Sequence, residues 1–154
     1  MDFDSSETIK KLALIVFTRL RSIKNGDGSD LQSVVDETIE FSVKNSIPPE
    51  VLLEGFNIYL SNNIFSAAFI YADAAAGMST GKIKSIAHCN AGVASYRMGL
   101  ADEAEKQYEL ALASDPDDAM THSNYGILLE EIGRNEDAEE HFRLAKAHRK
   151  ADTN

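Results

Sequence analysis

The sequence contains one cysteine, no tryptophan and three prolines among its 154 residues. A lone cysteine, Cys89, cannot form an internal disulfide, which fits a reducing compartment. Basic residues are also in short supply, with 15 Lys and Arg against 25 Asp and Glu and a formal net charge of −10. Because sequence-independent nucleic-acid binding needs clustered Lys and Arg, we expect no nucleic-acid partner.

Long apolar runs are missing as well. The run LALIVF at 12–17 has six residues, too few for the apolar segment of a signal peptide and far too few for a membrane span. We therefore expect no membrane insertion and a cytoplasmic location. The remaining composition, with 44% hydrophobic and 26% charged residues, is typical of a globular domain.

The sequence also lacks the signatures of catalysis, metal binding and cofactor binding. The stretch AAGMSTGKIK at 75–84 has the Gly-Lys pair of a nucleotide-binding loop, but Ala76 stands in place of the first glycine and Ile83 in place of the hydroxyl residue. His88 and His122 lack the three or four convergent ligands that a metal needs. To act as a nucleophile, Cys89 would need a base and an electropositive setting, and no Ser/His/Asp order or carboxylate dyad stands out. We predict no enzyme activity, no catalytic residue, no metal site and no cofactor.

What the sequence does contain is a series of helical segments. Pro and Gly are scarce inside the long segments, and the β-branched alternation that marks strands is absent. Breaks occur at the Gly-rich stretch 24–30, at Pro48 and Pro49, and at 61–63. The segments between these breaks predict an all-α fold.

Six positions recur at a fixed offset of 34 between the segments 85–118 and 119–152. The matched pairs are Asn90 with Asn124, Gly92 with Gly126, Gly99 with Gly133, Ala104 with Ala138, Tyr108 with Phe142, and Ala111 with Ala145. A glycine in mid-helix costs about 1 kcal/mol relative to alanine. Gly92 and Gly126 therefore predict close approach of a paired helix. We expect Tyr108 and Phe142 to fill the space between layers. Gly99 and Gly133 are expected to end the first helix of each pair.

A further copy lies upstream. It has four residues with the same mutual spacings at a larger offset of 37: Gly55, Ala67, Tyr71 and Ala74. We expect the three extra residues to lengthen the connection at 75–84. We also expect Asn62 to end the first helix of this copy in place of glycine, because Asn tolerates the left-handed conformation.

This order of glycine, alanine and aromatic positions resembles the tetratricopeptide repeat, over about 48–150 of the chain. The resemblance implies a right-handed α–α superhelix, in which helix hairpins stack in series. We expect an N-terminal helical hairpin at 1–47, followed at 48–154 by three repeats at about 48–84, 85–118 and 119–152.

Resemblance to this family also implies that the first helix of each hairpin lines a concave groove. The residues that map to the groove are Leu52, Phe56, Tyr59, Ile86, Cys89, Val93, Tyr96, Arg97, Met120, Ser123, Ile127, Glu130 and Glu131. The first two repeats contribute mostly apolar and aromatic groups, whereas the third ends in a carboxylate pair. Such a groove suits a partner peptide or helix with apolar anchors and a basic end.

These features favour a non-catalytic adaptor that binds a protein partner. Two alternatives stay open at this stage: a small cytosolic chaperone, similar in plan to the bacterial type III secretion translocator chaperones, and a self-associating scaffold. The apolar segment around 12–20 must be buried somewhere. It can cap the stack of repeats, plug the groove or form a homodimer contact.

Overall fold

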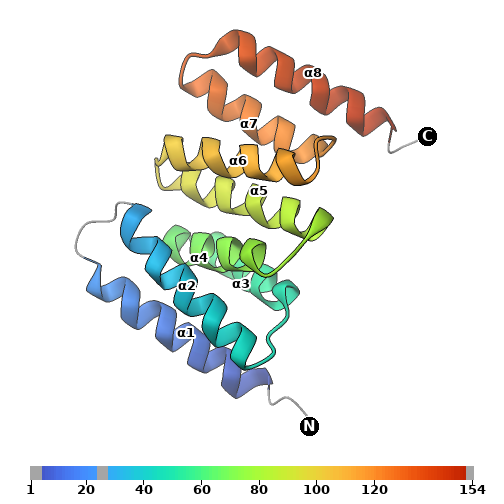
Figure 1. Ribbon diagram of the computed structural model, residues 1–154. Coiled ribbons are helices and arrows are strands. Elements are labelled where there is room, and N and C mark those ends of the chain that lie inside the picture. The colour runs from blue at the N-terminus through green and yellow to red at the C-terminus, as the bar shows by residue number, and fades with distance from the viewer. Residues whose placement is uncertain (1–4, 24–27, 152–154) are drawn as a thin grey trace.

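The computed structural model describes residues 5–23 and 28–151, so part of the predicted break at 24–30 lies outside the described residues. Within these residues the chain forms eight helices and no strand, which confirms the all-α prediction. The helices are α1 (Ser5–Ser22), α2 (Gly28–Lys44), α3 (Pro49–Ser61), α4 (Phe65–Gly77), α5 (Gly81–Arg97), α6 (Ala101–Ser114), α7 (Ala119–Glu131) and α8 (Asn135–Ala151). Figure 1 shows them stacked in series, with α1 and α2 at one end and α7 and α8 at the other. In the described part of the chain, no helix has the length and apolar character needed to cross a membrane.

Tight turns with a left-handed residue join the two helices of each repeat hairpin. Gly99 has φ +75° and Gly133 has φ +82°, a conformation that costs glycine nothing. In the α3–α4 turn this conformation belongs to Asn63, with φ +59°, so the prediction of Asn62 is wrong by one residue. Asn62 instead lies at the C-cap of α3, where its side-chain Nδ2 donates to the Ile58 carbonyl at 2.7 Å.

The connection between α4 and α5 is shorter than we predicted. Only residues 78–80 lie between the two helices, because Gly77 still belongs to α4 and Gly81 already begins α5. In the repeat alignment, Ser85 is the counterpart of Ala119, where α7 begins. The extra residues therefore extend α5 by about one turn rather than lengthening the loop.

The two helices of each hairpin approach closely at the predicted glycines. A Cβ placed on Gly92 would lie 2.5 Å from Cε1 of Tyr108, and one on Gly126 would lie 2.6 Å from Cε1 of Phe142. Such separations are far below van der Waals contact, so any larger residue would force the aromatic ring or the paired helix to shift. The predicted close approach of the paired helix is confirmed, and the structure adds that the aromatic rings of Tyr108 and Phe142 are the groups in contact with the two glycines.

The N-terminal pair of helices packs on the outside of α4. Helix α2 packs on α4, and α1 packs on both α2 and α4. Leu12 and Val16 of α1 are buried. Phe17 of α1 also meets the ring of Tyr59 on α3 edge to face, with ring centroids 5.4 Å apart. In the described chain the apolar side of α1 is therefore buried against the hairpin α3–α4.

Candidate functional site

The predicted groove residues of the first hairpin lie in the core. Leu52 and Phe56 of α3 are buried and share one cluster with residues of α4 and α5. Tyr59 lies between the rings of Phe17 and Tyr71, with ring centroids 5.4 and 4.9 Å away. Helix α1 thus covers this part of α3, and these three side chains are packed against the protein itself.

Helices α5 and α7 lie side by side in a fixed register. The Tyr96 hydroxyl of α5 donates to Glu131 Oε1 of α7 at 2.5 Å. Asn124 Nδ2 of α7 donates to the sulfur of Cys89 on α5 at 3.5 Å. Both pairs are separated by 35 residues, so each residue of α5 lies beside its repeat counterpart on α7, shifted by one position.

Large apolar side chains are exposed on these two helices. Ile86 of α5 is 40% exposed, and Met120 and Ile127 of α7 are 63% and 43% exposed. Met120 and Ile127 are seven residues apart and therefore share one side of α7. Val93, seven residues after Ile86, is half-buried on α5. We call the predicted groove residues that remain accessible on these two helices the α5–α7 face: Ile86, Val93, Tyr96, Met120, Ser123, Ile127, Glu130 and Glu131.

Two predicted residues of α5 are engaged within the protein. Cys89 is buried, and this burial raises the pKa of its thiol. A buried thiol with a raised pKa is a poor nucleophile, because the thiolate is the reactive form. The Arg97 guanidinium is exposed and lies over the Phe65 ring of α4, 4.8 Å from the ring centroid.

One end of the α5–α7 face is acidic. Glu130 and Glu131 are both exposed in the last turn of α7. The hydrogen bond that Tyr96 donates to Glu131 raises the pKa of the Tyr96 hydroxyl. The phenol therefore stays protonated and helps to fix the position of this carboxylate beside the apolar side chains.

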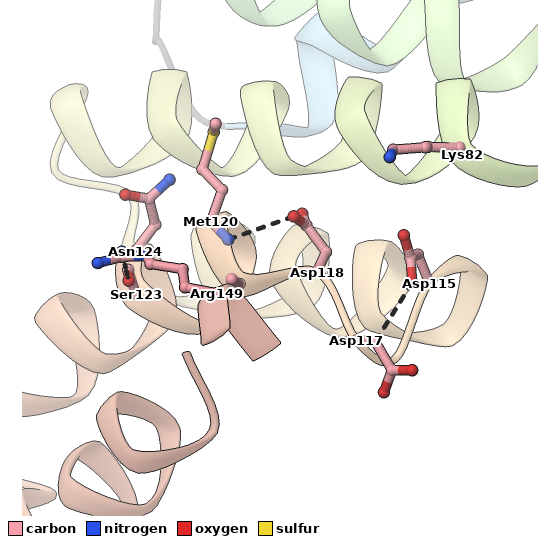
Figure 2. A pocket seen from close by; sticks show the side chains of 9 residues that line it. Lys82, Asp115, Asp117, Asp118, Met120, Ser123, Asn124 and Arg149 are labelled. Atoms are coloured by element: carbon pink, nitrogen blue, oxygen red, sulfur yellow. Dashed lines mark hydrogen bonds between the residues drawn. The ribbon is translucent and has the colours of Figure 1, made fainter. Parts of the chain in front are cut away.

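The other end of the face opens into a mixed-charge pocket of about 500 Å³. Figure 2 shows this pocket between the start of α5, the start of α7 and the end of α8. Lys82 and Arg149 line it together with three carboxylates, those of Asp115, Asp117 and Asp118. Arg149 Nη2 donates to Ser123 Oγ at 2.5 Å, which ties α8 to the α5–α7 face. Asp118 caps α7 and accepts from the backbone N–H groups of Met120 and Thr121.

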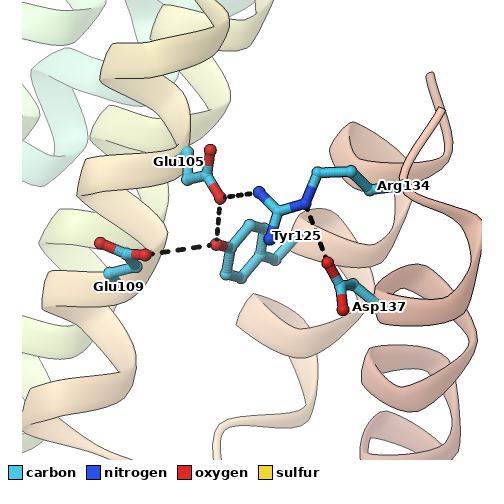
Figure 3. A network of polar contacts seen from close by, with 5 residues as sticks. All are labelled: Glu105, Glu109, Tyr125, Arg134 and Asp137. Carbon is cyan, nitrogen blue, oxygen red and sulfur yellow. Dashed lines mark hydrogen bonds and ion pairs between the residues drawn. The ribbon is translucent and has the colours of Figure 1, made fainter. Parts of the chain in front are cut away.

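A polar network away from the face holds α6, α7 and α8 together. The Tyr125 hydroxyl of α7 donates to Glu105 Oε1 of α6 at 2.7 Å, and Figure 3 shows Arg134 approaching the same carboxylate. Arg134 also pairs with Asp137 of α8 at 2.8 Å. The hydrogen bond from Tyr125, followed by Arg134, holds the pKa of Glu105 below its usual range. This network links the last hairpin to the hairpin before it.

The two sequence-predicted histidines occupy equivalent places but have different partners. His88 Nδ1 lies 2.8 Å from Gln107 Oε1, whereas His122 Nδ1 lies 2.9 Å from His141 Nδ1. In the part of the chain that the structure describes, no group of three or more His, Cys, Asp or Glu is arranged to hold a metal ion.

Sequence reasoning missed two features of this region. Ile58 of α3 is 59% exposed, although its neighbours Phe56 and Tyr59 pack inward. His148 stacks on His122, with ring centroids 5.7 Å apart, so three histidines gather on α7 and α8. The spacing of His122 and His141 matches that of His88 and Gln107, and this correspondence between repeats could have revealed the pair.

Comparison with known proteins identifies the repeat. Residues 107–140 match the family model of a tetratricopeptide repeat, a window that runs from α6 through α7 into α8. No curated protein matches the chain.

Solved structures of MamA have a similar fold. A crystal structure of MamA is 16% identical with a TM-score of 0.63, and the match covers 99% of this chain and 97% of that chain. A mutant of MamA is 21% identical with a TM-score of 0.62, covering 89% of this chain and 96% of that chain. At this level of identity the likeness concerns the fold. The family-model match at 107–140, with the glycine and aromatic pairs of the hairpins, identifies tetratricopeptide repeats in this chain. The likeness to MamA shows an all-α superhelical fold.

Proposed function

We propose that this protein is a non-catalytic adaptor that binds a segment of a partner protein on the α5–α7 face. The observation that carries the proposal is the exposure of Ile86, Met120 and Ile127 on neighbouring helices in fixed register. Single exposed apolar residues are ordinary on protein surfaces, but a cluster flanked by polar groups is typical of an interaction site. The tetratricopeptide fold supports a protein partner rather than a small substrate.

The partner is expected to combine apolar anchors with a basic end. Its apolar side chains would cover Ile86, Met120 and Ile127, and its basic end would lie beside Glu130 and Glu131. The net charge of −10 favours the approach of a basic segment over an acidic one. Either a helix or an extended peptide meets these requirements.

The expected affinity is moderate. Burial of each apolar anchor contributes roughly 1.5–3 kcal/mol. Ordering of the partner segment and loss of translational freedom offset a large part of this gain. The balance gives a dissociation constant in the micromolar range, which corresponds to a free energy of binding on the order of −8 kcal/mol. Lifetimes of such complexes are short, which suits an adaptor that exchanges partners.

The proposal places the site on α5 and α7 rather than along all three hairpins. Leu52 and Phe56 are buried, and Tyr59 is packed against Phe17. Helix α3, the first of the three predicted groove helices, therefore offers less accessible apolar surface than the sequence pattern implies.

A binding assay with matched variants tests the proposal. The test variant carries Met120→Glu and Ile127→Glu, two exposed positions whose replacement leaves the core intact. The control variant carries Val43→Glu on α2, where the side chain is 63% exposed, as Met120 is. Each chain is checked for folding by circular dichroism and then used to capture proteins from a lysate of its source organism. The mass of each chain alone is measured across a range of concentrations.

A protein that is retained by the wild type and Val43→Glu, and lost with Met120→Glu/Ile127→Glu, supports the adaptor proposal. Capture of the same proteins by the wild type, the control variant and the test variant would overturn it. A mass that rises with concentration in the wild type but not in the test variant would instead make the α5–α7 face a self-association surface. A client that is unstable on its own and survives only in the complex would identify a chaperone.

A further inference from the structure

Equivalent positions of the last two hairpins hold different side-chain pairs. In hairpin α5–α6 the pair is His88 and Gln107, with Nδ1 and Oε1 at 2.8 Å. In hairpin α7–α8 it is His122 and His141, with the two Nδ1 atoms at 2.9 Å. Both pairs span 19 residues and join the two helices of their hairpin. One molecule thus contains a histidine–glutamine pair and a histidine–histidine pair at the same structural place.

The surroundings of His122 determine which nitrogen carries its proton. Its Nε2 lies 2.9 Å from the carbonyl oxygen of Pro116, which can only accept a hydrogen bond. In the neutral ring, Nε2 must therefore carry the hydrogen, and Nδ1 must be the acceptor. His141 Nδ1 must then carry a hydrogen and donate it to His122 Nδ1. The pair is satisfied only when a single hydrogen lies between the two rings.

This arrangement limits how many protons the pair can hold. His141 can accept a proton on Nε2 and still donate from Nδ1. His122 has no such freedom, because its second proton would occupy Nδ1 and face the N–H of His141 across 2.9 Å. Two donors and two positive charges would then oppose each other, so the hydrogen bond between the helices would be lost.

The pair in hairpin α5–α6 has no such limit. Gln107 Nε2 donates to Asp73 Oδ1 at 3.2 Å and to Glu103 Oε1 at 2.9 Å, so its Oε1 faces His88 as an acceptor. His88 then donates from Nδ1. This hydrogen bond uses Nδ1 alone, so it does not depend on whether Nε2 of His88 carries a hydrogen.

We propose that the His122–His141 pair is a pH-sensitive latch, which loosens α8 from α7 when the pair takes up its second proton, whereas hairpin α5–α6 stays closed. Among the described helices, only α7 packs extensively against α8. Without this hydrogen bond, the polar contacts that remain near α8 include the Arg149–Ser123 hydrogen bond and the Arg134 link between Asp137 and Glu105. The groups that move with α8 include Arg149, which donates to Ser123 on the α5–α7 face.

The charged and titratable groups around the latch come from three elements besides α7. From α8, His148 stacks on His122, and Asp137, Glu140 and Arg134 at its start act on His141. Asp117, in the loop before α7, lies 3.6 Å from His148 Nε2. From α6, Glu105 and Glu109 accept from Tyr125, whose ring lies 4.4 Å from the His141 ring.

The net effect of these groups on His141 favours the neutral ring. Burial, and then the neighbouring His122, lower the pKa of His141 below its ordinary value, against the opposing pull of Asp137 and Glu140. A lowered pKa in the folded state means that the open hairpin binds more protons, so the latch is fully closed above about pH 6.5 and weakens as pH falls. Each proton taken up on opening changes the opening equilibrium by about tenfold per pH unit.

Hydrogen exchange of the wild-type chain from pH 7.5 to 5.5 tests this proposal, because both hairpins are measured in the same sample. After correction for intrinsic exchange rates, we expect the protection of α8 to fall by about tenfold or more relative to α5 and α6. His141→Gln should abolish most of this fall, because glutamine can present either a donor or an acceptor to His122, as Gln107 can to His88. His148→Gln should leave the fall in place.

Three results would overturn the proposal. Imidazole nitrogen spectra above pH 7 should show His122 protonated on Nε2 and His141 on Nδ1, and the opposite tautomers would overturn the proposal. The proposal would also be overturned if the hydrogen-exchange protection of α8 changed with pH in the same way as that of α5 and α6. A third contrary result would be that His148→Gln, rather than His141→Gln, removes the loss of α8 protection at low pH. All samples contain a chelator, so that a bound metal cannot hold the two rings together.

Discussion

Helices α4 and α8 are both the second helix of a repeat hairpin, yet their surroundings are opposite. Helix α4 is enclosed by α1, α2, α3 and α5, and nine of its 13 residues are buried. Helix α8 packs on α7, and two of its 17 residues, Ala138 and Ala145, are buried. Figure 1 shows α8 at the outer end of the stack and α4 inside it.

The comparison shows that hairpins with the same repeat pattern can have different roles. In repeat proteins each hairpin is stabilised mainly by its neighbours, so local stability follows the number of neighbours. The enclosed hairpin α3–α4 provides the core, and the predicted groove residues of α3 are packed against the protein itself. The outer hairpin α7–α8 contributes Met120 and Ile127 to the α5–α7 face and relies on a few specific polar contacts.

The largest expected difference lies between core truncations in the two helices. Ile70 of α4 is fully buried, and Ile70→Ala should lower the free energy of unfolding by about 3 kcal/mol, the usual cost of such a cavity. Leu144 of α8 is half-buried, and Leu144→Ala should cost about 1 kcal/mol. Urea unfolding measures both values. Equal costs would show that α8 is held as tightly as α4.

A smaller difference is expected between the two glycines that approach aromatic rings. Gly92→Ala would press against the fully buried ring of Tyr108 and should cost about 2 kcal/mol. Phe142 is only half-buried and can shift toward solvent, so Gly126→Ala should cost about 1 kcal/mol or less. Thermal unfolding of the two variants ranks them. A more damaging Gly126→Ala would contradict the looser packing of the outer hairpin.

The smallest expected effect concerns the helix caps. Asp118 accepts from the N–H groups of Met120 and Thr121 at the start of α7, so Asp118→Ala should cost about 1 kcal/mol. Thr80 stands at the start of α5 without a side-chain cap bond, so Thr80→Ala should be close to neutral. Unfolding curves of both variants at pH 7.5 decide whether hairpin α7–α8 depends more on its N-cap than hairpin α5–α6 does.

Much of the fold follows from spacing in the sequence. The offset of 34 makes Gly92 equivalent to Gly126 and Tyr108 equivalent to Phe142, and the same glycine–aromatic contact occurs in both hairpins. The all-α fold also follows from helical segments with clear breaks. Local details depend on the exact length of a helix, which spacing does not determine. The left-handed residue after α3 is therefore Asn63 rather than Asn62, and the extra residues after α4 extend α5.

The candidate site was harder to predict, because accessibility depends on distant parts of the chain. The repeat pattern treats Leu52, Phe56 and Tyr59 as equivalents of Cys89, Val93 and Tyr96. Leu52 and Cys89 are both buried, but Phe56 is buried where Val93 is half-buried, and Tyr59 is covered by Phe17 of α1. The N-terminal segment has no repeat spacing from which this placement could be inferred.

Photo-crosslinking tests the central claim, that partners bind on the α5–α7 face. A photoreactive phenylalanine is introduced in place of Met120 in one chain and in place of Val43 in another. Both positions are 63% exposed, but Met120 lies on α7 and Val43 on α2. Both chains are irradiated inside cells of the source organism. The account predicts a crosslink to a distinct protein from position 120 and none from position 43. Crosslinks to that protein from position 43 alone, or equally from both positions, would contradict it.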